Sequence, residues 1–253
     1  MNHQLNNPLG RISTLIYGVI CYLNFLVIFL YFIAFINNIF LPKTLDSARI
    51  IDWRYGLLIN VLLLLLFGLQ HSGMARPKFK QIWTKIIPTG IERSTYVLLS
   101  SLCLVILMLF WQPLGVQIWQ IENILIFYLF YGLNASGWLL VLVATFSLNH
   151  FDLFGLRQVF LHFQGKEYTQ ITFETPILYR IVRHPLYVGF LMGMWFTPSM
   201  TISHLIFAMG LTVYILAAIQ WEEKDLIEIH GESYRTYQKH VPMLIPKLPI
   251  RMK

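Results

Sequence analysis

Residues 183–189 read Arg183-His184-Pro185-Leu186-Tyr187-Val188-Gly189, and the chain then continues without a Lys, Arg, Asp or Glu until Glu222-Glu223. This apolar run is long enough to cross a membrane twice, because one crossing takes about 20 residues. A polar, proline-containing turn divides it at Thr197-Pro198-Ser199-Met200-Thr201. The run therefore predicts a helical hairpin whose two polar ends lie on the same side of a bilayer.

The composition of the whole chain also indicates a membrane protein. Of the 253 residues, 57% are hydrophobic and 12% are charged, and the mean hydropathy is +0.60. A soluble domain carries about 25% charged residues. We therefore predict an all-α fold: a polytopic membrane helical bundle of about six transmembrane helices, with the C-terminal hairpin followed by a cytoplasmic C-terminal helix. The spans are expected near residues 16–37, 55–71, 95–111, 124–148, 186–198 and 202–220.

The distribution of charge predicts the orientation in the membrane. The loop between the second and third spans carries Arg76, Lys78, Lys80, Lys85 and Arg93, whereas the next loop has no Lys or Arg. Basic loops stay in the cytoplasm, so both termini and the active site should face it, as in a multi-pass protein of a bacterial inner membrane. The net charge of +7 suits an anionic leaflet and does not indicate a nucleic-acid partner. The two cysteines lie in apolar segments and give neither a disulfide framework nor a metal-ligand spacing.

Polar residues at the base of the hairpin could form a binding site. A proline in the first turn of a helix costs no hydrogen bond, and the free N–H groups of that turn can hold a carboxylate. Glu222 and Glu223 could bind an ammonium group or hydroxyls, and Tyr179 and Tyr187 offer aromatic faces. Each residue alone is more simply explained as an interfacial anchor. The specific signal is the combination.

That combination is His-Pro-x-Tyr-x-Gly, a hairpin, Glu-Glu and then Gly-Glu-x-Tyr-x-x-Tyr. It resembles the C-terminal half of the membrane methyltransferases related to isoprenylcysteine carboxyl methyltransferase and the phospholipid methyltransferases. The resemblance implies that S-adenosylmethionine binds at the cytoplasmic mouth of the last helices. It implies these cofactor-binding residues: Tyr179, His184, Pro185, Leu186, Tyr187, Glu222 and Glu223.

Two further motifs narrow the resemblance. The segment His71-Ser72-Gly73-Met74-Ala75-Arg76-Pro77, with Glu92-Arg93, looks like the N-terminal half of NnrU-type membrane proteins. The segment Asn149-His150-Phe151-Asp152-Leu153-Phe154-Gly155-Leu156-Arg157-Gln158 is similar to the methanethiol S-methyltransferases, which make dimethyl sulfide. This resemblance implies one integral-membrane methyltransferase domain over residues 1–253, with an NnrU-like half (1–112) and a cofactor-binding half (124–247). It implies a small thiol substrate, the lipid bilayer as surroundings and no obligatory protein partner.

Methyl transfer from a sulfonium to a thiol is an in-line displacement, so the enzyme mainly aligns two sulfur atoms and supplies a thiolate. A nearby cation lowers the pKa of a thiol from about 8.5. We therefore single out His150, Asp152, Arg157 and Arg183 as candidate catalytic residues. Arg157, Arg183, His150 or His71 would supply that positive field, and a histidine or Asp152 would take the proton. The structural alternative is that His150 and Asp152 only cap the fourth span.

The sequence leaves two alternatives open. The NnrU resemblance extends to zeta-carotene isomerase, and His71 could be an axial haem ligand. That hypothesis predicts a Soret band and a second histidine facing His71, whereas His204 lies on the other side of the predicted topology. Within the methyltransferase hypothesis, the acceptor could instead be a prenyl-cysteine, a lipid or another small thiol such as hydrogen sulfide.

Overall fold

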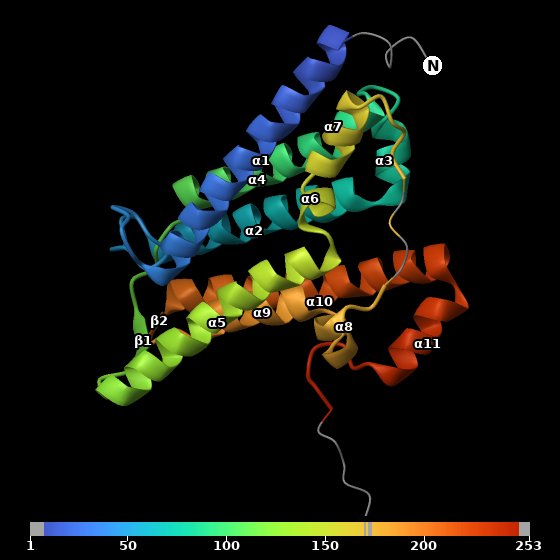
Figure 1. Ribbon diagram of the computed structural model, residues 1–253. Coiled ribbons are helices and arrows are strands. Elements are labelled where there is room, and N and C mark those ends of the chain that lie inside the picture. The colour runs from blue at the N-terminus through green and yellow to red at the C-terminus, as the bar shows by residue number, and fades with distance from the viewer. Residues whose placement is uncertain (1–7, 170, 172–173, 248–253) are drawn as a thin grey trace, which may run out of the picture. The chain divides into compact units, whose positions relative to one another are not determined.

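The computed structural model describes residues 8–169, 171 and 174–247. Its elements follow the chain in an almost wholly helical order (Figure 1). They are α1 (Pro8–Asn37), α2 (Trp53–Ala75), α3 (Pro77–Trp83), η1 (Thr89–Ile91), α4 (Glu92–Phe110), β1 (Gln117–Gln120), α5 (Ile124–Leu148), α6 (His150–Leu153), α7 (Leu156–Phe163), α8 (Ile177–Ile181), α9 (Pro185–Trp195), β2 (Ser199–Thr201), α10 (Ile202–His230) and α11 (Glu232–His240).

The predicted helical membrane bundle is confirmed. Among the described residues, five helical segments are long and apolar enough to cross a membrane: α1, α2, α4 with η1, α5 and α10. The predicted fifth span is α9, which has 11 residues and therefore rises only about 16 Å. This is shorter than a hydrocarbon core of about 30 Å. The predicted sixth span, α10, extends beyond residue 220 as far as His230.

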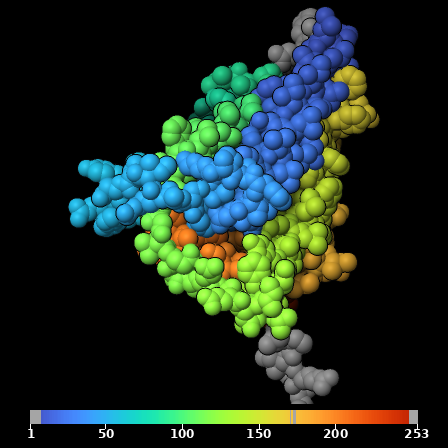
Figure 2. Space-filling model, turned by 90° about the vertical axis from the view of Figure 1, so that its left-hand side faces the viewer, coloured from blue at the N-terminus to red at the C-terminus, as the bar shows by residue number. Residues whose placement is uncertain are grey.

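The outward faces of the long helices are apolar. Large hydrophobic side chains such as Val27 and Leu30 of α1 and Leu125 and Leu129 of α5 are exposed. Figure 2 shows part of the surface of α1, in blue, and of α5, in yellow-green. Apolar surface of this extent on long helices is what lipid covers in an integral membrane protein.

The turn expected at residues 197–201 is partly a strand. Ser199–Thr201 forms β2, which pairs antiparallel with β1 in the register Gln117↔Thr201, Trp119↔Met200 and Gln120↔Ser199. The sequence analysis did not predict this two-stranded sheet. β1 is only four residues long and exposed on both faces, so it lacks the alternation of apolar and polar residues by which strands are predicted.

The described chain divides into two compact units. Unit 1 takes its residues from 1–120, 151–170 and 199–211, and unit 2 takes its residues from 121–150, 171–198 and 212–253. In unit 1, α4 packs against α1 and α2, and α7 packs against α1. In unit 2 the main packing is α5 against α9.

Glycines bring α5 and α9 of unit 2 close together. A Cβ atom on Gly189 would lie 2.7 Å from the carbonyl oxygen of Gly137, and one on Gly193 would lie 2.6 Å from the Trp138 ring. The Asn134 amide donates to the Gly193 carbonyl over 2.7 Å. Small residues four apart permit such close approach between helices in a membrane. The start of α9, which carries His184 and Pro185, is thereby fixed against α5.

Candidate active site

The polar residues predicted at the base of the hairpin come together in unit 2. His184 precedes α9 as its N-cap, and Pro185 occupies the first turn, as the sequence predicted. Glu222 and Glu223 lie on the second half of α10. We call Arg183, His184, Tyr187, Glu222 and Glu223 the hairpin cluster.

Glu223 is the buried centre of the hairpin cluster. Its Oε1 lies 2.6 Å from the Nε of Arg183 and 2.9 Å from the Nε2 of His184. Its Oε2 accepts from the side-chain amide of Gln238 over 2.8 Å. The side chains of Arg183 and Glu223 are only 12% and 10% exposed. Both carboxylate oxygens are therefore already occupied by donors of the protein itself.

Arg183 also fastens the segment that follows α11. Its Nη1 donates to the carbonyl oxygens of Val241 and Gln238 over 2.6 and 3.2 Å. The backbone N–H groups of Arg183 and His184 donate to the carbonyls at Pro242 and Met243. The N–H group of His184 is thus paired with the chain and is not a seat for a carboxylate. These contacts favour a positioning role for Arg183.

Glu222 differs from its neighbour in its exposure. Its side chain is 43% exposed, and its Oε2 accepts from the Tyr187 hydroxyl over 3.0 Å. The Nδ1 of His184 lies 3.9 Å from the same oxygen. Glu222 thus presents a carboxylate that is oriented by the protein and still reaches outside it, which is what binding a cation requires.

Three tyrosines surround the hairpin cluster as neutral groups. Burial raises the pKa of Tyr179, and the charge of Glu222 raises it further. Burial also raises the pKa of Tyr237 to about 12, and it raises the pKa of Tyr234, with Glu223 adding to the shift. The Tyr237 hydroxyl donates to the Tyr179 carbonyl. These tyrosines therefore carry neutral hydroxyl groups and are not bases. Of the remaining predicted residues, Pro185 is buried and Leu186 is half-buried.

Asp152 and Arg157 meet in unit 1. The Nη1 of Arg157 lies 3.0 Å from the Oδ1 of Asp152, and the Tyr168 hydroxyl donates to Oδ2 over 3.3 Å. The guanidinium also donates to the carbonyl and hydroxyl oxygens of Thr169, each over 2.8 Å, and lies 5.2 Å from the centre of the Tyr168 ring. Burial and the Asp152 charge raise the pKa of Tyr168. The pair therefore tethers residues 168–169.

The motif that includes Arg93 and the motif that includes Asp152 also contact each other in unit 1. Gly155 has φ +88°, and a Cβ atom there would lie 2.6 Å from the Ser94 hydroxyl oxygen. The Nε of Arg93 donates to the Leu153 carbonyl over 2.8 Å. Glycine is required at residue 155 for both its dihedral angle and its close approach to α4. The motif around residue 93 thus holds the end of α6, the helix that carries Asp152.

His150 belongs to unit 2, where it is buried. Its ring stacks on Phe146 with 4.2 Å between centres, and its Nδ1 lies 2.9 Å from the Thr145 hydroxyl oxygen. Thr145 donates its one hydroxyl hydrogen to the Leu142 carbonyl over 2.7 Å, so Nδ1–H of His150 is the donor to Thr145. The Nε2 atom then carries the lone pair. Burial lowers the pKa of His150, which keeps the ring in this neutral form.

His71 of α2 has polar partners in unit 1. Its Nδ1 lies 3.1 Å from the Ser100 hydroxyl, and the Tyr96 hydroxyl lies 3.1 Å from both ring nitrogens. His204 pairs with Asp46. These contacts account for both histidines without a haem.

Sequence reasoning missed several residues of the site. Gln238 and the carbonyls at residues 241–243 were not expected to contact Glu223 and Arg183, and Tyr168 and Thr169 were not expected beside Arg157. A glutamine or a backbone carbonyl leaves no signature in one sequence. Sequence reasoning also missed the packing role of Gly189 and Gly193, although small residues four apart are a sequence signal typical of packed membrane helices.

The bundle and the buried Arg–His–Glu cluster at the base of its hairpin define an integral membrane protein with a polar site near the end of its last long helix. Comparison with known proteins identifies the family. The chain is 55% identical over 241 residues to a methanethiol S-methyltransferase of Crocosphaera subtropica, covering 95% of this chain and 94% of that protein. It is 49% identical to the Pseudomonas deceptionensis enzyme of the same name, covering 94% and 91%, and 46% identical to that of Mycobacterium tuberculosis, covering 93% and 97%.

The chain therefore belongs to the methanethiol S-methyltransferase family. No family model matches the sequence, and no solved structure matches it.

Proposed function

We propose that this protein transfers the methyl group of S-adenosylmethionine to methanethiol and releases dimethyl sulfide. The observation that carries the proposal is the likeness to relatives of that name over at least 93% of the chain. The proposal places the cofactor at the hairpin cluster and the active site at the cytoplasmic face of a bacterial inner membrane. The basic loop that contains Arg76, Lys78 and Lys80 supports that orientation.

The hairpin cluster fits the cofactor chemically. S-adenosylmethionine carries an ammonium group, a carboxylate, a flat adenine and a methyl group on a positively charged sulfur. The half-exposed carboxylate of Glu222, oriented by Tyr187, suits the ammonium group or the ribose hydroxyls. The protonated Tyr237, which is half-buried, offers an aromatic face for the adenine or the sulfonium, whereas Tyr179 and Tyr234 are buried.

Arg183, His184 and Glu223 have a different role in this proposal. Because their side chains satisfy one another inside the protein, they position Glu222 and the segment after α11 and do not themselves hold the cofactor. Arg183 is therefore a positioning residue. It does not stabilise the thiolate, which is the role expected for it from the sequence.

His150 is the proton acceptor in this proposal, because its neutral ring carries a lone pair on Nε2. The thiol gives its proton to Nε2, its sulfur forms the new bond to the methyl carbon, and the bond from that carbon to the sulfonium breaks. A base must be neutral to accept the proton. Since burial lowers the pKa of His150, the base is competent at neutral pH, and turnover falls as the pH drops through that lowered pKa. Asp152 and Arg157 serve in this proposal by holding residues 168–169 of unit 1.

The test is a headspace assay on purified protein in detergent. With S-adenosylmethionine and methanethiol together, dimethyl sulfide should appear in the gas chromatogram, and neither substrate alone should yield it. His150→Gln should lower kcat about 100-fold with cofactor affinity retained, whereas His162→Gln, on α7, should leave kcat unchanged. Absence of dimethyl sulfide, with a Soret band in the absorption spectrum, would replace the proposal with a haem protein. Comparison with hydrogen sulfide and a prenyl-cysteine would define the acceptor.

A further inference from the structure

The chain leaves the end of α1 in an unusual backbone conformation. Asn38 has φ +57° and Phe40 has φ +61°, and the Ile39 N–H closes the last turn by donating to the Ala34 carbonyl over 3.1 Å. Asparagine tolerates this left-handed region at a helix end, but a bulky aromatic residue rarely adopts it. The conformation of residues 38–40 must therefore be held by contacts elsewhere.

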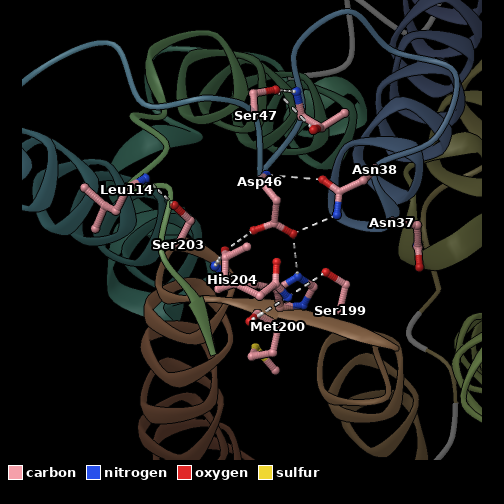
Figure 3. Close-up of polar contacts among 12 residues, drawn as sticks. Asn37, Asn38, Asp46, Ser47, Leu114, Ser199, Met200, Ser203 and His204 are labelled. Carbon is pink, nitrogen blue, oxygen red and sulfur yellow. Dashed lines mark hydrogen bonds and ion pairs between the residues drawn. The ribbon is translucent and has the colours of Figure 1, made fainter. Parts of the chain in front are cut away.

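Asp46 supplies the first of those contacts. The Asn38 amide nitrogen donates to the Oδ2 of Asp46 over 2.7 Å, and the Asp46 N–H donates to the Asn38 side-chain oxygen over 3.2 Å. Figure 3 shows the two side chains facing one another across the loop. The Leu45 N–H also donates to the Phe35 carbonyl over 3.1 Å. The loop is thus folded back onto the end of α1.

The same carboxylate is held by the first turn of α10. The Thr201 hydroxyl donates to Oδ1 of Asp46, and the Nδ1 of His204 lies 3.2 Å from Oδ2. The His204 N–H donates to Thr201 Oγ1 over 3.1 Å. The side chains of His204 and Asp46 are only 1% and 8% exposed. We call Asn38, Asp46, Thr201 and His204 the Asp46 clasp, and all four residues belong to unit 1.

The clasp leaves Phe40 projecting from the protein. This side chain is 97% exposed, and at the far end of the loop Ile50 is 81% exposed and Trp53 is half exposed. The Arg54 guanidinium lies 5.7 Å from the centre of the Trp53 ring. The light-blue stretch around residue 50 is prominent on the face seen in Figure 2. Val27 and Leu30, on the α1 helix that precedes Phe40, are exposed as well.

We infer that the loop from residue 38 to residue 52 is a membrane-interface anchor, in which the Asp46 clasp directs Phe40 into the boundary between lipid headgroups and acyl chains. Aromatic residues and arginine at span ends occupy this layer. The occupant of the exposed surface is therefore lipid, because the loop joins two spans, α1 and α2, and exposes Phe40 and Ile50 beside the exposed apolar side chains of those spans.

Spin-label accessibility tests this inference in the full-length protein reconstituted in phosphatidylcholine–phosphatidylglycerol vesicles. The two native cysteines, Cys21 and Cys103, are replaced by alanine, and a nitroxide is attached at Phe40→Cys or, as the matched control, at Ala48→Cys, which is exposed in the same loop. The label at residue 40 should be relaxed more by oxygen, which partitions into lipid, than by a water-soluble nickel complex. The label at residue 48 should show the opposite preference.

The clasp is tested by adding Asp46→Ala to the labelled proteins, or Asn38→Gly, which relieves the backbone while removing the side-chain contacts. The preference for oxygen at residue 40 should then fall, while residue 48 changes little and the protein elutes as before in size-exclusion chromatography. Equal exposure of residues 40 and 48 to nickel would overturn the anchor. Shielding of residue 40 from both relaxants would replace lipid with a protein contact, and an unchanged residue 40 without Asp46 would overturn the role of the clasp.

Discussion

The His184–Glu223 pair of unit 2 and the His204–Asp46 pair of unit 1 contain the same two kinds of side chain but differ in the side chains that contact them. Each joins a buried histidine to a buried carboxylate, over 2.9 and 3.2 Å. Around Glu223 stand a charged Arg183 and a second, half-exposed carboxylate, Glu222. Around Asp46 the other donors are the neutral side chains of Asn38 and Thr201.

The difference shows how a polar cluster for binding can be distinguished from one that holds the chain. The donors named around Asp46 come from the loop and from the start of α10, and they fill its carboxylate oxygens. In unit 2 the inner carboxylate is filled in the same way, yet the adjacent carboxylate still reaches outside the protein. We therefore propose that Glu223 and Asp46 hold segments of the chain in place and that Glu222 binds the cofactor.

The largest expected effect is that of Glu223→Ala, which leaves the Arg183 guanidinium buried without its carboxylate. Removing one partner of a buried ion pair destabilises a protein by about 3–5 kcal/mol. Thermal unfolding in detergent should show this loss, together with loss of S-adenosylmethionine binding. Glu223→Gln, which keeps the shape and one acceptor oxygen, should be milder. If Glu223→Ala unfolded like the wild type, the holding role of Glu223 would be wrong.

The packing beneath the hairpin cluster gives the second effect. Gly189→Ala forces a methyl group to within 2.7 Å of the Gly137 carbonyl, and overpacking of this kind destabilises by about 1–3 kcal/mol. Gly132→Ala is the control on α5, because a Cβ atom there meets nothing within 4 Å. Thermal unfolding of the two variants should separate them. Equal midpoints would mean that α5 and α9 do not depend on this close contact.

The sequence predicted part of the region that these two variants probe. The apolar runs predicted the long helices, because these depend on local hydrophobic patterns. The dipeptide His184-Pro185 predicted the start of α9, because proline is favoured in the first turn of a helix. The grouping of Arg183 with Glu223 followed from the hairpin, since both ends of a hairpin return to one side. The sequence could not separate Glu222 from Glu223, because which of two adjacent residues on a helix faces inward depends on the packing around α10.

The Asp46 clasp lay beyond sequence reasoning for a similar reason. Asp46 and His204 are 158 residues apart in the chain. Non-local pairing of this kind needs a fold before it can be recognised, whereas the Glu222-Glu223 pair could be read as a local signal.

Asp46→Asn tests the clasp as a holding cluster with a smaller effect. An asparagine turns one acceptor oxygen into a donor, so one of the Asn38, Thr201 and His204 donors loses its partner. We expect a loss of about 1–2 kcal/mol in thermal unfolding with methyl transfer to methanethiol unchanged. The control is Asp225→Asn on α10, whose side chain is half-buried in unit 2. A fall in kcat for Asp46→Asn at full stability would show that this cluster does more than hold the loop.

Glu222→Gln should have the smallest effect on folding and the most specific effect on binding. The side chain is 43% exposed, so solvent screens its charge, and the unfolding midpoint should not move. Calorimetric titration should show S-adenosylmethionine binding about fivefold to tenfold more weakly, because the amide keeps the Tyr187 contact but loses the charge that would face the ammonium group. Glu228→Gln, at an exposed position on the same helix, controls for a general change of charge. If both variants bound the cofactor as the wild type does, the two neighbouring glutamates would both be holding residues, and the distinction between the unit 2 cluster and the Asp46 clasp would disappear.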